Sequence, residues 1–569
     1  MSPERKLKVV FCWHMHQPEY RQMSSGDFAL PWTYLHALKD YTDMAWHLEQ
    51  VPGARAVVNF VPILLDQLAD YCQQFENGNF RDPLLRALAL PDLGTLGQDD
   101  RRQLLSSCFR ANQEHLIDPF PGYRHLQQLY QHTVESDADS LEYLSVQYFA
   151  DLVTWYHLAW TGETVRRSHP EIISLMAKGH GFTPADRQQL IHIYGQVFAD
   201  LIPRYRRLAD SGKIELSTTP YFHPILPLLQ DLKVAAESLD APLPAREAYP
   251  GGIERARWHL EAAKQSHREL FGHEVTGMWP AEGGVSDATL HLMAHEGLQW
   301  AATGEGVLAN SLRRQIEGEL PDRVEYLYQP YRVSDGRAGI CCFFRDDRLS
   351  DLIGFEYSRW FGRDAVDHFV HELEKIRELS ADQPDPVVSI ILDGENAWEY
   401  YPYNGFYFLS GLYQRLAEHP GIEMSTYRDY LVNSQAPCPA SLDKVVAGSW
   451  VYGTFSTWIG SPDKNRAWEL LCDAKSAFDA VIARGELNPA QLTPALHQLA
   501  ICEGSDWFWW FGDYNPDDTV RDFDALYRAN LANLYRLIKL PVPRVLEDTI
   551  SVGAGHPASG GVMRPGQVH

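Results

Sequence analysis

Seven short apolar segments recur along the amino-terminal two thirds of the chain. Each is rich in β-branched or aromatic side chains and runs continuously apolar rather than alternating between apolar and polar positions. Such runs are typical of parallel strands buried on both faces. Most are separated by stretches with helical periodicity, which predicts a parallel β/α sheet or barrel. The segments are residues 8–14, 54–60, 213–219, 274–280, 298–304, 339–346 and 386–394.

Polar side chains follow these segments at their carboxyl ends. In a β/α barrel the strand ends and the loops after them form the active face, so we expect these side chains to share one site. The alternative is that the strands simply end in polar turns. The residues are His14, His16, Asn59, Thr218, Thr219, Glu282, Thr303, Arg345, Asp346, Asp393 and Glu395.

Helical patterns interrupt the strands and then replace them. The long gap between the second and third segments predicts a helical insertion at about 75–205. After residue 405 the pattern is helical, so we predict a catalytic barrel at 1–405 and a helical domain at 406–545. The stretch 546–569 is rich in Gly, Pro and Ser and is predicted to be a disordered tail.

Charge narrows the classes of partner. The 569 residues include 50 Lys and Arg and 75 Asp and Glu, a formal charge of −25. Phosphate binding needs clustered Lys and Arg, so nucleic acid is not expected as a partner, whereas a neutral substrate suits the chain. Aromatic residues make up 12%, which fits either a large core or a sugar-binding cleft.

The cysteines and the apolar runs bear on the compartment. The eight cysteines are scattered without a CxxC pair, so we interpret them as buried thiols of a reducing compartment. No apolar run is long enough for a signal peptide or a membrane span. We therefore expect a cytoplasmic protein without a membrane partner; the oligomeric state is left open.

Two motifs supply candidate polar residues for the site. In FCWHMHQPEY, His14 and His16 alternate off a strand end and point the same way. They can bind a metal or hydrogen-bond substrate hydroxyls, and we favour the second because no Asp or Cys stands nearby at ligand spacing. Glu215 lies inside an apolar strand, where a carboxylate needs a partner, and His223 follows it. This pair either supports the site, or Glu215 is a buried structural residue.

Two further motifs supply the strongest candidates for chemistry. Glu282 follows a strand in TGMWPAEGGVSD, between Trp279 and two glycines that permit an unusual loop. Asp393 is the first residue after the apolar run of IILDGENAWEYY, and Glu395 points the same way. Two carboxyl groups from two strands are what a glycosidase needs, with pKa values set apart by their environments.

Two aromatic-rich stretches lie in the helical part of the chain. ICEGSDWFWWFGD contains Asp506, Trp507 and Trp510, and the earlier stretch 447–468 contains Trp450. These rings either bury themselves in the helical domain or form an aromatic wall over the cleft. We favour the second interpretation for some of them.

In this order, the motifs resemble the five signature regions of glycoside hydrolase family 57. The matching blocks are HQP, the HPILPL region, WPAEGGVS, LDGENAWE and EGSDWFWW. The resemblance implies an incomplete TIM-like (β/α)7 barrel followed by a helical domain that closes one side of the cleft. It also implies a retaining α-glucan-active enzyme without a metal or other cofactor, closest to the α-amylase and amylopullulanase branch.

Carried over by position, the resemblance assigns roles to individual residues. Glu282 would be the nucleophile and Asp393 the general acid/base. The remaining family positions would orient or stack on sugar rings, or support the carboxylates and their loops: His14, His16, Glu215, His223, Trp279, Glu395, Trp450, Asp506, Trp507 and Trp510.

The expected substrates are glycogen, starch or maltodextrins, cleaved at α-1,4 bonds by double displacement, with α-1,6 bonds as an additional option. The first alternative is a 4-α-glucanotransferase that uses the same residues. A second is a metal-dependent α-mannosidase or deacetylase with His14, His16 and Asp393 as ligands. A third is a glycan-binding protein without turnover.

Overall fold

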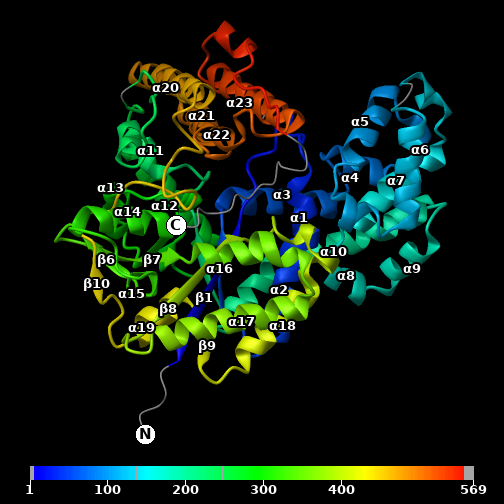
Figure 1. Cartoon of the computed structure of the whole chain (residues 1–569). Coiled ribbons are helices and arrows are strands. Elements are labelled where there is room, and N and C mark those ends of the chain that lie inside the picture. Colours follow the sequence, from blue (N-terminus) through cyan, green and yellow to red (C-terminus); the bar gives the residue numbers. More distant parts are fainter. Residues whose placement is uncertain (1–5, 23, 136–137, 247, 556–569) are drawn as a thin grey trace.

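A closed barrel of parallel strands forms the centre of the molecule (Figure 1). The computed structural model describes residues 6–22, 24–135, 138–246 and 248–555. Every pairing around the ring is parallel, and β8 closes it by pairing with both β1 and β7. All seven predicted segments are strands of this ring: β1 (Leu7–Met15), β2 (Ala56–Phe60), β3 (Ile214–Thr218), β4 (Gly277–Met278), β5 (Trp300–Gly304), β7 (Gly339–Arg345) and β8 (Val387–Asp393).

The inside of the barrel is packed with side chains from alternate strand positions. Apolar groups such as Val10, Cys12 and Ile391 fill its lower layers. Helix α19 (Tyr427–Asn433) adds Tyr427 and Tyr430 to the same cluster. A filled interior leaves only the ends of the strands for a site, as in other β/α barrels.

Three short strands extend the sheet beyond the ring. Strand β6 (Tyr331–Ser334) pairs antiparallel with β7, β9 (Ile422–Met424) pairs with β1, and β10 (Ala440–Ser441) pairs with β6. The last two follow residue 405, so the sheet continues past the predicted start of the helical domain. Within the described residues, the predicted helical domain at 406–545 contains no named strand beyond β10.

Helices cover the outside of the barrel. Between β1 and β2 lie α1 (Trp32–His36) and α2 (Thr42–Gln50), and α3 (Pro62–Asn77) follows β2. The later helices on the barrel are α11 (Leu226–Gln230), α12 (Gly252–Phe271), α13 (Asp287–His295), α14 (Glu305–Gln315), α15 (Arg323–Leu327), α16 (Asp347–Asp351), α17 (Gly362–Leu379) and α18 (Phe406–Ala417).

The long gap between β2 and β3 is helical, as the sequence predicts. Most of its helices form an arm to one side of the barrel (Figure 1), and the long α10 leads back to β3. They are α4 (Pro83–Ala89), α5 (Gln98–Cys108), α6 (Pro121–His132), α7 (Val146–Ala159), α8 (Glu163–Ser168), α9 (Pro170–Lys178) and α10 (Pro184–Asp210).

A second helical group stands beside the strand ends (Figure 1). It contains α20 (Pro462–Ala483), α21 (Pro489–Cys502), α22 (Asp506–Trp510) and α23 (Asp517–Leu537). Of the predicted tail, residues 556–569 lie outside the described residues, whereas Ser551 is buried and donates to Asp463. None of the described helices combines the length and apolar character needed to cross a membrane.

A buried ionic cluster fastens this second group to the barrel. Glu503, at the end of α21, accepts hydrogen bonds from Arg255 (2.7 Å) and His259 (2.7 Å) of α12 and from Tyr249 (2.6 Å). Burial alone would raise the pKa of Glu503, but Arg255 and His259 outweigh it and lower that pKa to about 2. Glu503 therefore stays ionised.

Candidate active site

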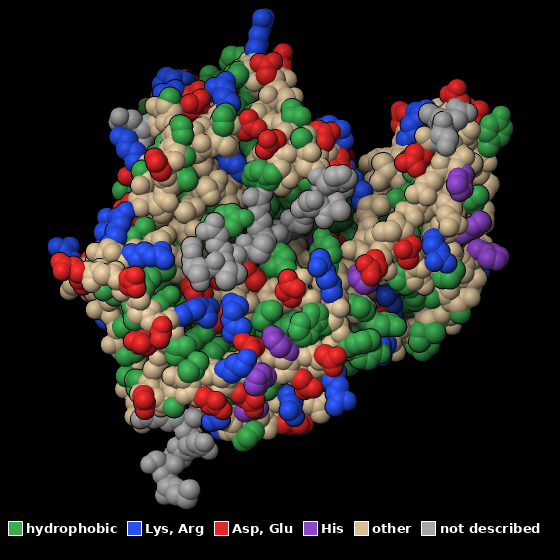
Figure 2. Space-filling view, in the orientation of Figure 1, with side chains coloured by type: hydrophobic (Ala, Val, Ile, Leu, Met, Phe, Trp, Pro, Cys, Tyr) green, Lys and Arg blue, Asp and Glu red, His purple; other side chains and the backbone are tan. Residues whose placement is uncertain are grey.

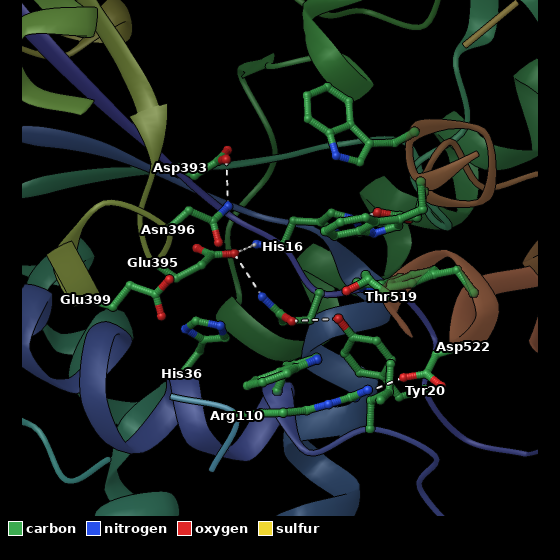
Figure 3. A pocket seen from close by; sticks show the side chains of 18 of the residues that line it. His16, Tyr20, His36, Arg110, Asp393, Glu395, Asn396, Glu399, Thr519 and Asp522 are labelled. Carbon is green, nitrogen blue, oxygen red and sulfur yellow. Dashed lines mark hydrogen bonds and ion pairs between the residues drawn. The ribbon is translucent and has the colours of Figure 1, made fainter. Parts of the chain in front are cut away.

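A cavity of about 450 Å³ opens at the carboxyl ends of the barrel strands. Its walls come from three parts of the chain: the barrel loops, the start of the helical arm and the second helical group (Figure 3). Nine predicted site residues line it: His14, His16, His223, Glu282, Asp393, Glu395, Trp450, Asp506 and Trp510.

Glu282 is held in a strained turn just after β4. Its backbone lies in the left-handed region with φ 58°, a conformation that is costly for a residue with a side chain and that clusters at functional sites. Gly283 follows with φ 59°, and a Cβ there would come within 2.7 Å of the Trp279 ring. Only glycine fits at this second position, so the turn is fixed by its sequence.

The carboxylate of Glu282 contacts two donors from beyond the barrel strands. Trp450 Nε1 donates to Oε2 at 3.1 Å, and Ser505 Oγ donates to Oε1 at 3.4 Å. Burial, together with the negative charges of Asp393 and Asp506, raises the pKa of Glu282 well above its usual value. The two hydrogen bonds oppose this shift but do not cancel it.

Asp393 is the last residue of β8 and is hydrogen-bonded on one side only. Asn396 Nδ2 donates to Asp393 Oδ2 at 2.8 Å (Figure 3). Burial raises the pKa of Asp393 to about 6. Because each of these buried carboxyl groups disfavours the charge of the other, the pair is suited to hold one proton near neutral pH.

Glu395 braces the loop that carries Asp393. Its Oε1 accepts from the backbone N–H of His16 (3.2 Å) and from Gln17 Nε2 (3.2 Å). Gln17 in turn accepts from the Tyr20 hydroxyl at 3.0 Å (Figure 3). Glu395 thus ties the end of β8 to the end of β1, and burial raises its pKa well above the usual value.

Three histidine rings stack beside the carboxylates. The His16 and His223 ring centroids lie 3.8 Å apart, and His14 Nε2 lies 3.1 Å from His223 Nε2. Asn59 Oδ1 accepts from Thr219 and lies 2.7 Å from His14 Nδ1, so His14 donates from that nitrogen. Burial and the neighbouring His16 lower the pKa of His14 to about 3 and that of His223 well below its usual value. Both rings are therefore neutral donors and acceptors.

The second helical group reaches into the site through the start of α22. Asp506 Oδ1 lies 2.8 Å from His16 Nε2, and Ser505 Oγ lies 2.8 Å from His223 Nδ1. Ligand atoms of His16, His223 and Asp506 all lie within 4.8 Å of one another, so these three residues are the group that could hold a metal ion here. The set differs from the His14, His16 and Asp393 of the metal hypothesis.

Three predicted substrate-binding residues do not line the cavity. Glu215 is near the amino end of β3, where it accepts from Thr276 (2.6 Å) and Trp300 (2.8 Å) inside the barrel. Trp279 is fully buried behind Glu282. Trp507 is buried among the helices and donates to the Ile501 carbonyl at 2.8 Å. These three side chains therefore lie outside the cavity that the other nine predicted residues line.

The sequence analysis missed one whole wall of the cavity. Trp32, Trp160 and Phe109 come from α1 and the helical arm, and Phe523 comes from the second helical group. None follows a barrel strand, so the rule that points to strand ends could not find them. Their shared signal is aromatic character alone.

An ion pair bridges the two helical parts across the same wall. Arg110, just after α5, donates to Asp522 Oδ2 at 2.9 Å and to Asp518 Oδ2 at 3.2 Å on α23. All three residues line the cavity, and Figure 3 shows Arg110 and Asp522 next to Tyr20. The arm and the second helical group thus meet at one end of the cavity.

Comparison with known proteins agrees with this architecture. The model of glycosyl hydrolase family 57 matches residues 10–437. A branching enzyme of that family from Thermococcus kodakaraensis has a similar fold, with a TM-score of 0.58 at 14% identity over 93% of this chain and 90% of that one. An alpha-amylase from Thermotoga maritima gives a TM-score of 0.56 at 13% identity over 95% of both chains.

A 4-alpha-glucanotransferase from Thermococcus litoralis is also similar. Its TM-score is 0.51 at 14% identity, over 94% of this chain and 60% of the other. At these identities the solved structures establish the shared fold, and they come from enzymes with three different activities.

Proposed function

The chain belongs to glycosyl hydrolase family 57, and from this premise we propose that it cleaves α-1,4-glucosidic bonds of glycogen, starch or maltodextrins with retention. One observation carries the proposal: the carboxyl groups of Glu282 and Asp393 face the same cavity, and the pKa values of both are raised. The α-glucan class is taken from the similar enzymes named above.

In the proposed reaction the two carboxyl groups divide the work. Asp393 gives its proton to the glycosidic oxygen as the bond to the anomeric carbon breaks. Ionised Glu282 attacks that carbon and forms a glycosyl ester. Asp393, now ionised, takes a proton from water, and the water oxygen displaces Glu282. This sequence needs the single proton of the pair to lie on Asp393 and Glu282 to be ionised when the substrate is bound.

The surrounding residues support the charges and hold the sugar. Trp450 and Ser505 donate to Glu282, and these hydrogen bonds oppose the rise of its pKa. The neutral His14 and His223 contact Asn59, each other and Ser505 through their ring nitrogens, so they position Ser505 beside Glu282. The Trp510 ring, which lines the cavity, offers a flat face for a pyranose.

Transfer to a second sugar is the alternative that the cavity itself favours. Trp32, Phe109 and Trp160 line the same cavity as Glu282 and Asp393. An acceptor sugar bound on such a wall would exclude water from the ester, and its hydroxyl would then displace Glu282 instead.

The products from maltoheptaose separate these possibilities. Shorter maltooligosaccharides alone indicate hydrolysis, and a mixture of shorter and longer ones indicates transfer. Both outcomes require that Glu282→Gln and Asp393→Asn abolish turnover and that a chelator leave it unchanged. Turnover lost to the chelator would favour a metal on His16, His223 and Asp506, and no turnover on any α-glucan would overturn the proposal. Pullulan tests for α-1,6 cleavage.

A further inference from the structure

Exposed aromatic side chains gather on one surface of the protein, outside the cavity. Of the seven exposed Phe, Tyr and Trp residues in the described part of the chain, five fall between residues 360 and 407. Figure 2 shows hydrophobic side chains gathered on the face that carries α17 and α18. The five, here called the aromatic patch, are Trp360, Phe361, Tyr400, Tyr403 and Tyr407.

The members of the aromatic patch come from two segments that touch. Phe361 is 83% exposed, Tyr403 59% and Tyr407 55%. A Cβ on Gly362 would lie 3.4 Å from Tyr407 Cβ, which places the peptide after Phe361 against α18. The Tyr403 and Tyr407 rings lie 5.5 Å apart at 90°. Water-exposed rings at this density are unusual on a soluble surface and mark binding sites.

A strained turn holds Tyr403 outward. Tyr403 and Asn404 both have φ 54°, in the left-handed region. The Asn404 side chain accepts from Lys39 at 3.0 Å and donates to the buried Asp43 at 2.9 Å. The buried side chains of Lys39 and Asp43 therefore fix the conformation of this turn. Persistent backbone strain of this kind is typical of positions kept for binding.

A cation from the helical arm holds the next ring of the patch. The Arg167 guanidinium lies 4.1 Å from the Phe406 ring centre and 5.4 Å from that of Tyr407. Its Nη2 also donates to the Tyr407 hydroxyl at 3.2 Å. Tyr407 is thus oriented while still more than half exposed, which lowers the entropy lost on binding a ligand.

The aromatic patch is continuous with the cavity wall. Glu399 lines the cavity, and the next residue, Tyr400, is 38% exposed and belongs to the aromatic patch. Asp393 and the aromatic patch also share one segment, since β8 leads through this loop into α18. The segment that carries Tyr400, Tyr403 and Tyr407 therefore begins one residue after the cavity wall.

We propose that the aromatic patch of Trp360, Phe361, Tyr400, Tyr403 and Tyr407 is a second binding site for α-glucan chains, outside the catalytic cavity. This proposal rests on the proposed function. Exposed rings with polar edges stack on the apolar faces of glucose units while their hydroxyls remain in contact with water. A long glucan held at both places is kept near Glu282 and Asp393 by effective concentration, whereas a short one gains nothing.

The test compares a polymer with a short oligosaccharide. The patch variant combines Phe361→Ser, Tyr403→Ser and Tyr407→Ser. The matched control is Tyr143→Ser, because Tyr143 is 88% exposed on the helical arm, outside the patch. Glycogen binding is measured by retardation in native gels containing glycogen, and KM is measured on both glycogen and maltoheptaose.

We expect the patch variant to bind glycogen about tenfold more weakly and to show a raised KM on glycogen. Its KM and kcat on maltoheptaose should match those of the wild type and of Tyr143→Ser. Unchanged glycogen retardation in the patch variant would overturn the inference, as would a wild type that acts on maltoheptaose but is not retarded by glycogen. A dimer lost in the patch variant would show that a second copy covers the patch. Inactivity of the wild type on all α-glucans would instead overturn the proposed function.

Discussion

At the scale of single residues, the cavity puts carboxyl groups where ionisation is hardest. Burial is the largest cause of the raised pKa of both Glu282 and Asp393, and the charge of Asp393 raises that of Glu282 further. The strained φ of Glu282 and of His223, 58° and 59°, shows that the backbone is also held in costly conformations there. The raised pKa values and the strained backbone both cost free energy, so they persist only where a well-packed fold holds these residues in place.

The first prediction concerns the pH dependence of the reaction. With wild-type protein, kcat/KM should be bell-shaped, because the pair must hold one proton and both limbs report its two titrations. With α-maltosyl fluoride, which needs no protonation of its leaving group, Asp393→Asn should lose the alkaline limb. Its acid limb should move to lower pH, since removing the charge of Asp393 lowers the pKa of Glu282. An acid limb that stays in place would contradict this coupling.

The second prediction concerns stability. The pKa of Asp393 is raised from 3.8 to about 6 in the folded protein, so its ionisation destabilises the fold as pH rises through that interval. Asp393→Asn should therefore increase the free energy of unfolding by about 3 kcal/mol at pH 8 and have little effect below pH 4. Urea unfolding at both pH values measures this, with the exposed Asp99→Asn as the control for net charge. Equal effects at both pH values would contradict the prediction.

At the scale of elements, the barrel strands were predictable from the sequence, but the aromatic cavity wall of Trp32, Phe109 and Trp160 was not. Seven continuous apolar runs are long enough to be recognised, whereas β9 and β10 span three and two residues and depend on distant partners. The position of a polar residue within its strand decides its role. Asp393 is the last residue of β8 and faces the cavity, whereas Glu215 lies near the start of β3 and faces the interior of the barrel. A single apolar run cannot reveal which end becomes functional.

The third prediction concerns the bridge between the helical arm and α23. Arg110→Ala removes both ion pairs at the end of the cavity, so longer maltooligosaccharides should reach past this point and the product distribution should change. The pairs are partly exposed, so stability should fall by less than about 1 kcal/mol. Arg102→Ala is the matched control, because Arg102 pairs with Asp99 on the surface of the arm. Identical product patterns for the two variants would contradict a role for Arg110 in chain length.

At the scale of the whole molecule, the site is complete only when both helical parts are in place. The barrel supplies Glu282 and Asp393, while Ser505 and Asp506 come from the second helical group. That group is fastened by Glu503, only two residues before Ser505. The resemblance of the motifs predicted that the helical domain contributes to the site. No sequence pattern marks the cluster of Glu503, Tyr249, Arg255 and His259 that joins the second helical group to the barrel.

The fourth prediction tests that fastening. Glu503→Gln leaves Arg255 buried without its ionised partner, which should lower the free energy of unfolding by about 3–5 kcal/mol at pH 7. Because the pKa of Glu503 is lowered to about 2, the wild type should lose this advantage progressively as pH falls below 4.5. The activity of the variant should fall with the same temperature dependence as its unfolding. A variant as stable as the wild type at pH 7 would contradict the assignment.

The central claim is that Glu282 becomes covalently bonded to the sugar, and mass spectrometry of Asp393→Asn treated with α-maltosyl fluoride tests it most directly. Fluoride leaves without needing an acid, and the ester then persists because no base activates water. We expect a maltosyl adduct on the peptide that contains Glu282 and none in the double variant that also carries Glu282→Gln. An adduct on another residue, or turnover of the fluoride by the double variant, would contradict it.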